Sequence, residues 1–230
     1  VQAGGVAQFG STGADSLQAS AADGSDLYTA GVESGRLVVR RFDLSGTQPQ
    51  LISSRDLGAA SGEVSGLQID NGRVVVGGTT RNAALDIGQV NRAHAGGTDA
   101  FVAVLEADLQ PSASDRLTYW GGAEDDTAAD LKMADGKVWI TGVADRPQDA
   151  KADDPTGAYL TRLDPLTGAV EWTRQWQGEG GQARPATLAV SAAGASVLDR
   201  LGLPQGEIDQ SPSKRLVDAT SLRAGDRFYI

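Results

Sequence analysis

Apolar and polar positions alternate along four short segments of the chain, Leu17–Ala19, Leu67–Ile69, Leu131–Met133 and Leu188–Val190. This alternation is typical of a strand with one buried face. A glycine-containing turn signal, such as Asn71-Gly72, follows each segment. Asn-Gly and Asp-Gly pairs supply the positive φ that a two-residue hairpin loop needs. The pattern therefore predicts a second strand directly after each turn.

Further apolar runs continue each of these units. The expected second strands are Leu27–Ala30, Val74–Val76, Val138–Thr141 and Ser196–Leu198. The expected third strands are Leu37–Phe42, Ala100–Leu105 and Ala158–Leu163, and the fourth are Leu51–Leu57, Arg116–Trp120 and Val170–Trp176. Four short strands that recur at ~40–50 residues plus insertions are typical of a β-propeller blade, whereas a β-sandwich would not repeat the same four steps. The fold class predicted is all-β, a propeller of four-stranded antiparallel blades.

The two ends of the chain suggest how the ring of blades closes. Val6–Gly10 has the pattern of a fourth strand without its first three, and the last unit lacks a clear fourth strand. We therefore expect one propeller domain over residues 1–230, with four blades and the N-terminal strand completing the last one. Its blade units are about 11–58, 59–121, 122–178, and 179–230 together with 1–10. Leu201–Leu222 fits no strand pattern, and the alternative is that the chain is a slice of a longer propeller.

Several motifs resemble the bacterial SBBP β-propeller repeat. They are Gly121–Thr127, Asp135–Gly142, the third-strand signature Gly96–Leu105, and Trp172–Trp176. The layout, with the tail Ser213–Ile230, also resembles flagellar regulatory proteins of the FlaEY type. The resemblance implies a binding or scaffold role in an exported, cell-surface or flagellum-associated bacterial protein, and it brings no catalytic motif.

Composition and charge narrow the possible functions. The chain is 40% hydrophobic, which suffices for a core, and its net charge of −10 argues against a nucleic-acid surface. It has no run of apolar residues long enough to span a membrane. The absence of cysteine excludes disulfides and thiolate sites, and the single histidine, His94, excludes a His-pair metal site.

Acidic residues gather in loops that should share one end of the propeller. In an antiparallel blade, the connection between the second and third strands and the connection to the next blade emerge at the same end. The long insertions 79–98, 143–155 and 202–223 are of the first kind, and Glu124–Asp126 is of the second kind. We expect this face to bind a protein partner, because long loops on a rigid scaffold usually carry recognition. Its predicted binding residues are Asp86, Asp125, Asp126, Asp149, Asp153 and Asp154.

Other chemistries stay open at this stage. Clustered aspartates could hold calcium, although no Asp-x-Asp-x-Asp-Gly loop is present, and no other cofactor is expected. Loop carboxylates could make the propeller carbohydrate-active, or an exposed aromatic strip could bind a polysaccharide without turnover. His94 is expected to be an exposed loop histidine without a catalytic partner. The four tryptophans, Trp120, Trp139, Trp172 and Trp176, are expected to pack in the core, with Trp139 aligned to Tyr28 and Val75.

Overall fold

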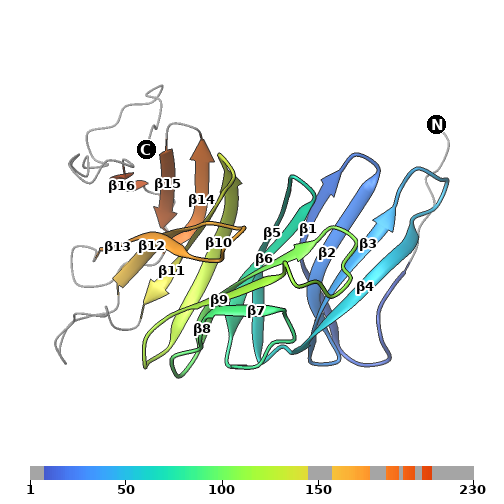
Figure 1. The fold of residues 1–230 in the computed structure, drawn as a ribbon, viewed down its shortest axis with the longest axis horizontal. Coiled ribbons are helices and arrows are strands. Elements are labelled where there is room, and N and C mark those ends of the chain that lie inside the picture. The colour runs from blue at the N-terminus through green and yellow to red at the C-terminus, as the bar shows by residue number, and fades with distance from the viewer. Residues whose placement is uncertain (1–7, 145–156, 177–184, 192–193, 200–203, 209–230) are drawn as a thin grey trace.

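A computed structural model describes residues 8–144, 157–176, 185–191, 194–199 and 204–208. The described elements are strands (Figure 1). The first sheet contains β1 (Asp15–Asp23), β2 (Asp26–Glu33), β3 (Arg36–Asp43) and β4 (Gln50–Ala59). The second contains β5 (Gly62–Asp70), β6 (Arg73–Thr80), β7 (Gln89–Arg92), β8 (Asp99–Glu106) and β9 (Arg116–Trp120). The third contains β10 (Asp126–Ala134), β11 (Lys137–Ala144), β12 (Gly157–Leu163) and β13 (Val170–Trp176), and the fourth contains β14 (Pro185–Ser191), β15 (Gly194–Asp199) and β16 (Pro204–Ile208).

Each sheet is built from a contiguous stretch of chain. The strand orders are β1-β2-β3-β4, β5-β6-β8-β9-β7, β10-β11-β12-β13 and β14-β15-β16. Neighbouring strands are antiparallel except for the parallel pair of β7 with β9. This arrangement confirms the prediction of an all-β fold made of four-stranded antiparallel sheets.

The four sheets lie side by side in chain order (Figure 1). The first strand of each sheet contacts the first strand of the next, so that β1 lies against β5, β5 against β10, and β10 against β14. The first sheet and the β14–β16 sheet lie at opposite ends of this row (Figure 1). The described sheets therefore form an open arc of blades.

The core consists of apolar layers between successive sheets. One layer joins the first and second sheets and includes Tyr28, Val39 and Leu67, each at most 2% exposed. A second layer joins the second and third sheets around Val75, and a third joins the third and fourth sheets around Trp139. A strand presents alternate side chains to its two faces, so each middle sheet contributes to both neighbouring layers.

The first two strands of each unit form the predicted hairpins. Asn71 and Asp135 have φ of +49° and +51°, and the glycine after each is also in the left-handed region, as a two-residue loop of this kind requires. Tyr28, Val75 and Trp139 all stand two residues after the start of the second strand, which confirms their predicted alignment.

The register of the first strand differs from the prediction made from leucine identities. In each of the first three sheets the first strand carries a bulge, and the residue before it is paired with a glycine of the second strand. That residue is Leu17 in the first sheet, Val64 in the second and Ala128 in the third. Ser20, and not Leu17, is therefore the counterpart of Leu67.

Phe9 contacts Phe42 of β3 with 4.5 Å between the ring centroids, and the expectation that the N-terminal strand completes the last blade stays a prediction. Val6 and Ala7 lie outside the described residues. The strand β16 falls in the segment Leu201–Leu222, for which the sequence predicted no strand. The strand β7 lies inside the insertion 79–98, where only a loop was expected.

Candidate functional site

The insertion between β6 and β8 runs along the outer edge of the second sheet and reaches the first. Its strand β7 pairs with the outermost strand β9, so that Gln89 lies opposite Arg116. Upstream of β7, the Asp86 N–H donates to the Leu57 carbonyl at the end of β4, with an N···O distance of 2.9 Å. The Leu85 N–H donates to the Tyr119 hydroxyl at 3.2 Å. These bonds attach the insertion to both sheets.

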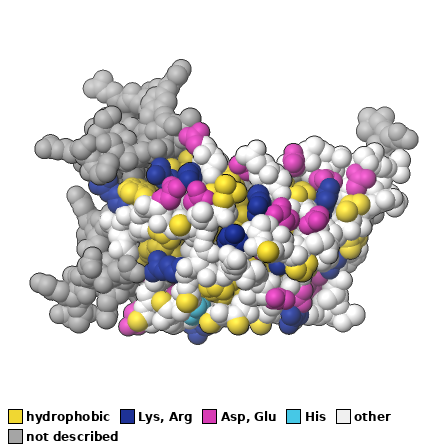
Figure 2. Space-filling model, viewed as in Figure 1, with side chains coloured by type: hydrophobic (Ala, Val, Ile, Leu, Met, Phe, Trp, Pro, Cys, Tyr) yellow, Lys and Arg dark blue, Asp and Glu magenta, His cyan; other side chains and the backbone are white. Residues whose placement is uncertain are grey.

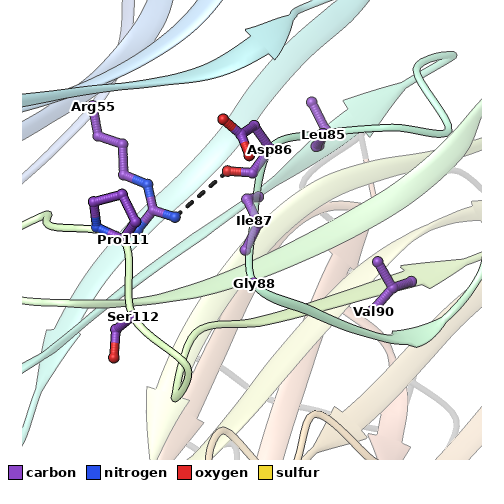
Figure 3. Close-up of a pocket in the computed structure, with 8 residues that line it drawn as sticks. All are labelled: Arg55, Leu85, Asp86, Ile87, Gly88, Val90, Pro111 and Ser112. Atoms are coloured by element: carbon purple, nitrogen blue, oxygen red, sulfur yellow. Dashed lines mark hydrogen bonds between the residues drawn. The ribbon is translucent and has the colours of Figure 1, made fainter.

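A cavity of about 460 Å³ lies beneath this insertion (Figure 3). Its lining combines apolar and polar side chains from β4, the insertion and the β8–β9 loop: Arg55, Leu85, Asp86, Ile87, Gly88, Val90, Pro111 and Ser112. A volume of this size and a mixed lining are typical of small-ligand or side-chain pockets.

Arg55, which lines the cavity, belongs to a buried ion pair. The Arg55 side chain is 7% exposed, and its Nη1 lies 2.7 Å from Oδ2 of Asp115, which is fully buried. Its Nη2 points to the Asp86 carbonyl oxygen at 3.5 Å, as the dashed line in Figure 3 marks. The Asp115 carboxylate also accepts the Ser112 N–H at 2.9 Å. The guanidinium is therefore held in place by groups of the protein.

The Asp86 side chain is the carboxylate that this cavity offers to a ligand. The residue is exposed, and its backbone N–H and carbonyl are already bonded to Leu57 and Arg55. Val90, which lines the same cavity, is 51% exposed. An anionic group beside exposed apolar surface suits a side chain that combines an apolar stem with a cationic end.

Asp125 lies where the insertion meets the connection between the second and third sheets. Its Oδ1 accepts the Thr98 N–H at 2.8 Å and lies 3.6 Å from the Arg81 guanidinium. The hydrogen bonds from Thr98 lower the pKa of the Asp125 carboxyl. Its side chain is 54% exposed. The prediction that these two loops emerge at the same end is confirmed at this point.

Asp126 was predicted on the exposed acidic face, but the structure buries it to 1% exposure. Its Oδ2 accepts the Gly122 N–H at 2.6 Å, which closes the turn that enters the third sheet. Asp99, also fully buried, lies beside it, because a Cβ on Gly121 would overlap carboxylate oxygens of both residues. Burial raises the pKa of the Asp99 carboxyl. A surface partner cannot reach either carboxylate, so this correction removes Asp126 from the acidic face.

His94 is also less accessible than predicted. Its side chain is 9% exposed and its ring stands edge-on to the Tyr119 ring, with 5.3 Å between centroids. Nε2 lies 3.3 Å from the Thr80 carbonyl oxygen, and Nδ1 lies 3.8 Å from Oδ2 of Asp99. These contacts fasten the end of the insertion to β6 and β8.

The three tryptophans with described side chains, Trp120, Trp139 and Trp172, pack between or within sheets, as predicted. Trp120 stacks on Tyr159 of the next sheet, with 3.6 Å between ring centroids. Trp139 is 4% exposed and contacts Trp172 edge-on at 6.0 Å. The Trp176 side chain lies outside the described residues.

Asp149, Asp153 and Asp154 of the predicted acidic face lie outside the described residues, so that Asp86 and Asp125 are its described exposed members. On the face drawn in Figure 2, acidic and basic side chains are interspersed over the first and second sheets.

Among the described residues, no group of three or more His, Cys, Asp or Glu side chains could hold a metal ion. No helix in the described part of the chain is long and apolar enough to cross a membrane.

The sequence did not single out Arg55, Leu85 or Ile87, which build the cavity with Asp86. The apolar pair Leu85 and Ile87, flanking an aspartate inside a polar insertion, was the available signal. Both side chains are at most 5% exposed, so they anchor the insertion and leave Asp86 outside. Arg55 carried no comparable signal, since its partner Asp115 is distant in the sequence.

Comparison with solved structures defines the class of protein: the chain has a β-propeller fold. The crystal structure of the computationally designed Ika4 protein, a designed propeller, superposes with a TM-score of 0.50 at 17% identity, covering 86% of this chain and 93% of that one. A chimera of ACO and RPE65 superposes less well, with a TM-score of 0.39 at 12% identity over 78% of this chain and 44% of that one.

A comparison with a curated relative is more specific than the comparison of folds. The chain is 34% identical to the regulatory protein FlaEY of Caulobacter vibrioides, over 97% of this chain and 26% of that protein. It thus spans about a quarter of the length of the relative that it matches. No protein-family model matches the chain, and the resemblance to the SBBP repeat stays a prediction.

Proposed function

We propose that this chain is a non-enzymatic β-propeller module that binds a protein partner through the insertion between β6 and β8, within a flagellum-associated bacterial protein. The observation that carries the proposal is the cavity of about 460 Å³ in which Asp86 is held against two sheets. The relationship to a flagellar regulatory protein supports the setting.

The chemistry of the site favours a partner with basic side chains. Asp86 and Asp125 are exposed carboxylates at this insertion, and the chain carries a net charge of −10. A negative surface attracts a basic partner over long range, and the cavity can then receive one lysine or arginine side chain. The exposed Val90 offers apolar area beside it.

A carbohydrate-active role receives less support from the same geometry. Glycoside hydrolysis uses two carboxylates ~5–9 Å apart on either side of a substrate. The cavity lining includes one carboxylate, Asp86, and the adjacent pair Asp99 and Asp126 is buried. Neither arrangement places two accessible carboxylates around a sugar.

The proposal is tested by crosslinked capture from a flagellum-enriched envelope fraction, with the full chain as bait. The bait carrying Asp86→Asn and Asp125→Asn should lose at least five-fold of a captured protein, and added salt should weaken capture. The matched control is Asp23→Asn, which removes an exposed aspartate at the β1–β2 turn, on the opposite end of the sheets. Equal capture by all three baits would contradict the proposed site.

A further inference from the structure

The strand β4 is the outer edge of the first sheet. It pairs with β3 on one side, and the described residues supply no strand on the other. Toward the end of β4, the Leu57 carbonyl accepts the Asp86 N–H of the insertion at 2.9 Å. Since β3 occupies the inner side, this carbonyl points to the outer edge. A backbone group of the insertion therefore already bonds to this edge at one position.

The preceding positions of β4 offer the same backbone groups without a described partner. N–H and C=O groups alternate between the two edges of a strand, so those of Arg55 and Ser53 point to the same edge as those of Leu57. The register between β3 and β4 is regular from Ser53 to Asp56. Within the described part of the chain, no backbone group bonds to Ser53 or Arg55 at this edge. Such a row of groups is a template for pairing with another extended chain.

The two faces of β4 lead to different surroundings. Arg55 pairs with Val39 of the layer between the first and second sheets, so the Arg55 side chain lies on that face. Leu51 pairs with Phe42, which stands three residues after Val39 on β3 and therefore on the opposite face. An extended chain added along this edge presents successive side chains to these two faces in turn.

The face that carries Arg55 leads to the cavity. Arg55 lines the cavity, and its Nη2 reaches the Asp86 carbonyl oxygen at 3.5 Å (Figure 3). The exposed Asp86 and the 51% exposed Val90 belong to the same lining. A side chain that enters from the edge of β4 thus meets one carboxylate and apolar surface. This combination fits a lysine or arginine, whose stem is apolar and whose end is cationic.

The opposite face offers exposed apolar side chains. Leu51 is 43% exposed, and Ile52, the bulge residue next to it, is 51% exposed. Phe42, the partner of Leu51, contacts the ring of Phe9, which is 42% exposed. An apolar side chain laid over this face removes apolar area from water, which is favourable.

We propose that the partner binds as an extended strand added to the outer edge of β4, with a lysine or arginine in the cavity and apolar residues at alternate positions facing Leu51 and Ile52. The inference rests on the proposed function and specifies the partner as a basic segment whose cationic residue is flanked by apolar ones. Backbone bonds to Ser53 and Arg55 supply affinity, and the two faces select the side chains. The net charge of −10 complements such a segment.

Titration of the full chain with synthetic peptides, followed by fluorescence anisotropy, tests the inference. The probe is the capped, labelled heptapeptide Val-Thr-Val-Lys-Val-Thr-Val, whose lysine and valines lie on opposite faces when it is extended. Two further probes carry backbone N-methyl groups either on the valines or on the lysine and threonines. One of these should bind about ten-fold or more weakly than the unmethylated peptide, and the other within about three-fold of it, because only alternate N–H groups face β4. Equal binding by both methylated probes, or no binding of the unmethylated peptide, would overturn the inference.

Variants of the chain separate this inference from the proposed function. Leu51→Thr combined with Ile52→Thr should weaken binding of the unmethylated peptide about three-fold or more. The matched control, Leu166→Thr, changes a residue 63% exposed in the turn between β12 and β13 and should leave binding unchanged. Asp86→Asn should also weaken binding.

The pattern of losses decides between the two proposals. If Asp86→Asn weakens peptide binding while the methyl groups and the changes at 51 and 52 do not, the cavity takes a basic side chain without strand addition. The inference then fails and the proposed function stands. Equal capture of a flagellar protein by all baits in the envelope experiment would remove the proposed function, and this inference with it.

Discussion

The buried ion pair between Arg55 and Asp115 gives the sharpest test of the energetics of the fold. Arg55→Met keeps much of the side-chain volume but leaves the Asp115 carboxylate, which is 0% exposed, without its cation. The carboxylate would retain the N–H groups of Ser112 and Glu106, at 2.9 and 3.3 Å, which offset part of the loss. Breaking a buried pair from one side typically costs about 3–5 kcal/mol.

That cost is a large share of the total free energy of unfolding of a domain, which is typically about 5–15 kcal/mol. Removing both charges should recover much of it, because the double variant Arg55→Met with Asp115→Asn leaves no buried ion. We therefore expect a coupling free energy of about 2 kcal/mol or more between the two positions. The free energy of unfolding is measured by denaturant titration with the fluorescence of the four tryptophans.

An exposed pair provides the control. Arg36 and Asp56 form an ion pair with side chains 54% and 44% exposed, so Arg36→Met should cost far less stability than Arg55→Met, because exposed ion pairs contribute little. If Arg55→Met costs no more than Arg36→Met, or if the two changes at 55 and 115 add without coupling, the reasoning about the buried pair is refuted.

Three further predictions concern single groups. Hydrogen bonding from Lys137 lowers the pKa of Asp164 to about 2, so the stability that this carboxylate contributes is present above pH 3.8 and is lost as the pH falls toward 2. Asp164→Asn should cost about 1 kcal/mol of unfolding free energy at pH 7 and reduce the loss of stability with acid in this pH window. Burial raises the pKa of Asp99, so stability declines as the pH rises above 3.8, and Asp99→Asn should raise the melting temperature at pH 7 but not at pH 3. The buried Tyr159 hydroxyl has no hydrogen-bond partner among the described residues, so Tyr159→Phe should leave the melting temperature unchanged or higher, and a drop of several degrees would contradict this.

The repeating strands and hairpins were predictable because they depend on local alternation and on turn residues. The register of the first strand was not, because Leu17 resembles Leu67 in type while distance from the turn aligns it with Val64. In the first sheet a serine, Ser20, stands at the register position that Leu67 has in the second. Matching Leu17 to Leu67 because both are leucines therefore shifted the predicted first strand by the distance between Leu17 and Ser20.

The site was less predictable than the fold. The run Glu124–Asp126 is uniformly acidic in sequence, yet Asp125 is exposed and Asp126 is buried. The difference arises because the Asp126 carboxylate turns inward to accept the Gly122 N–H. The strand β7 is short, mostly polar and parallel to β9, so it has neither an apolar alternation nor a hairpin turn to mark it. Both features depend on tertiary contacts that no local pattern encodes.

The contiguity of each sheet has a consequence for how such a chain can evolve. All described strand pairings join segments within one unit, and the units meet through side-chain layers, a short turn and a few polar contacts such as the bond from the Asp86 N–H to the Leu57 carbonyl. A genetic duplication or deletion of one whole unit would therefore leave every ladder of backbone hydrogen bonds intact. The length of such a protein can change in steps of one blade, with selection acting afterwards on the residues that face the neighbouring blades.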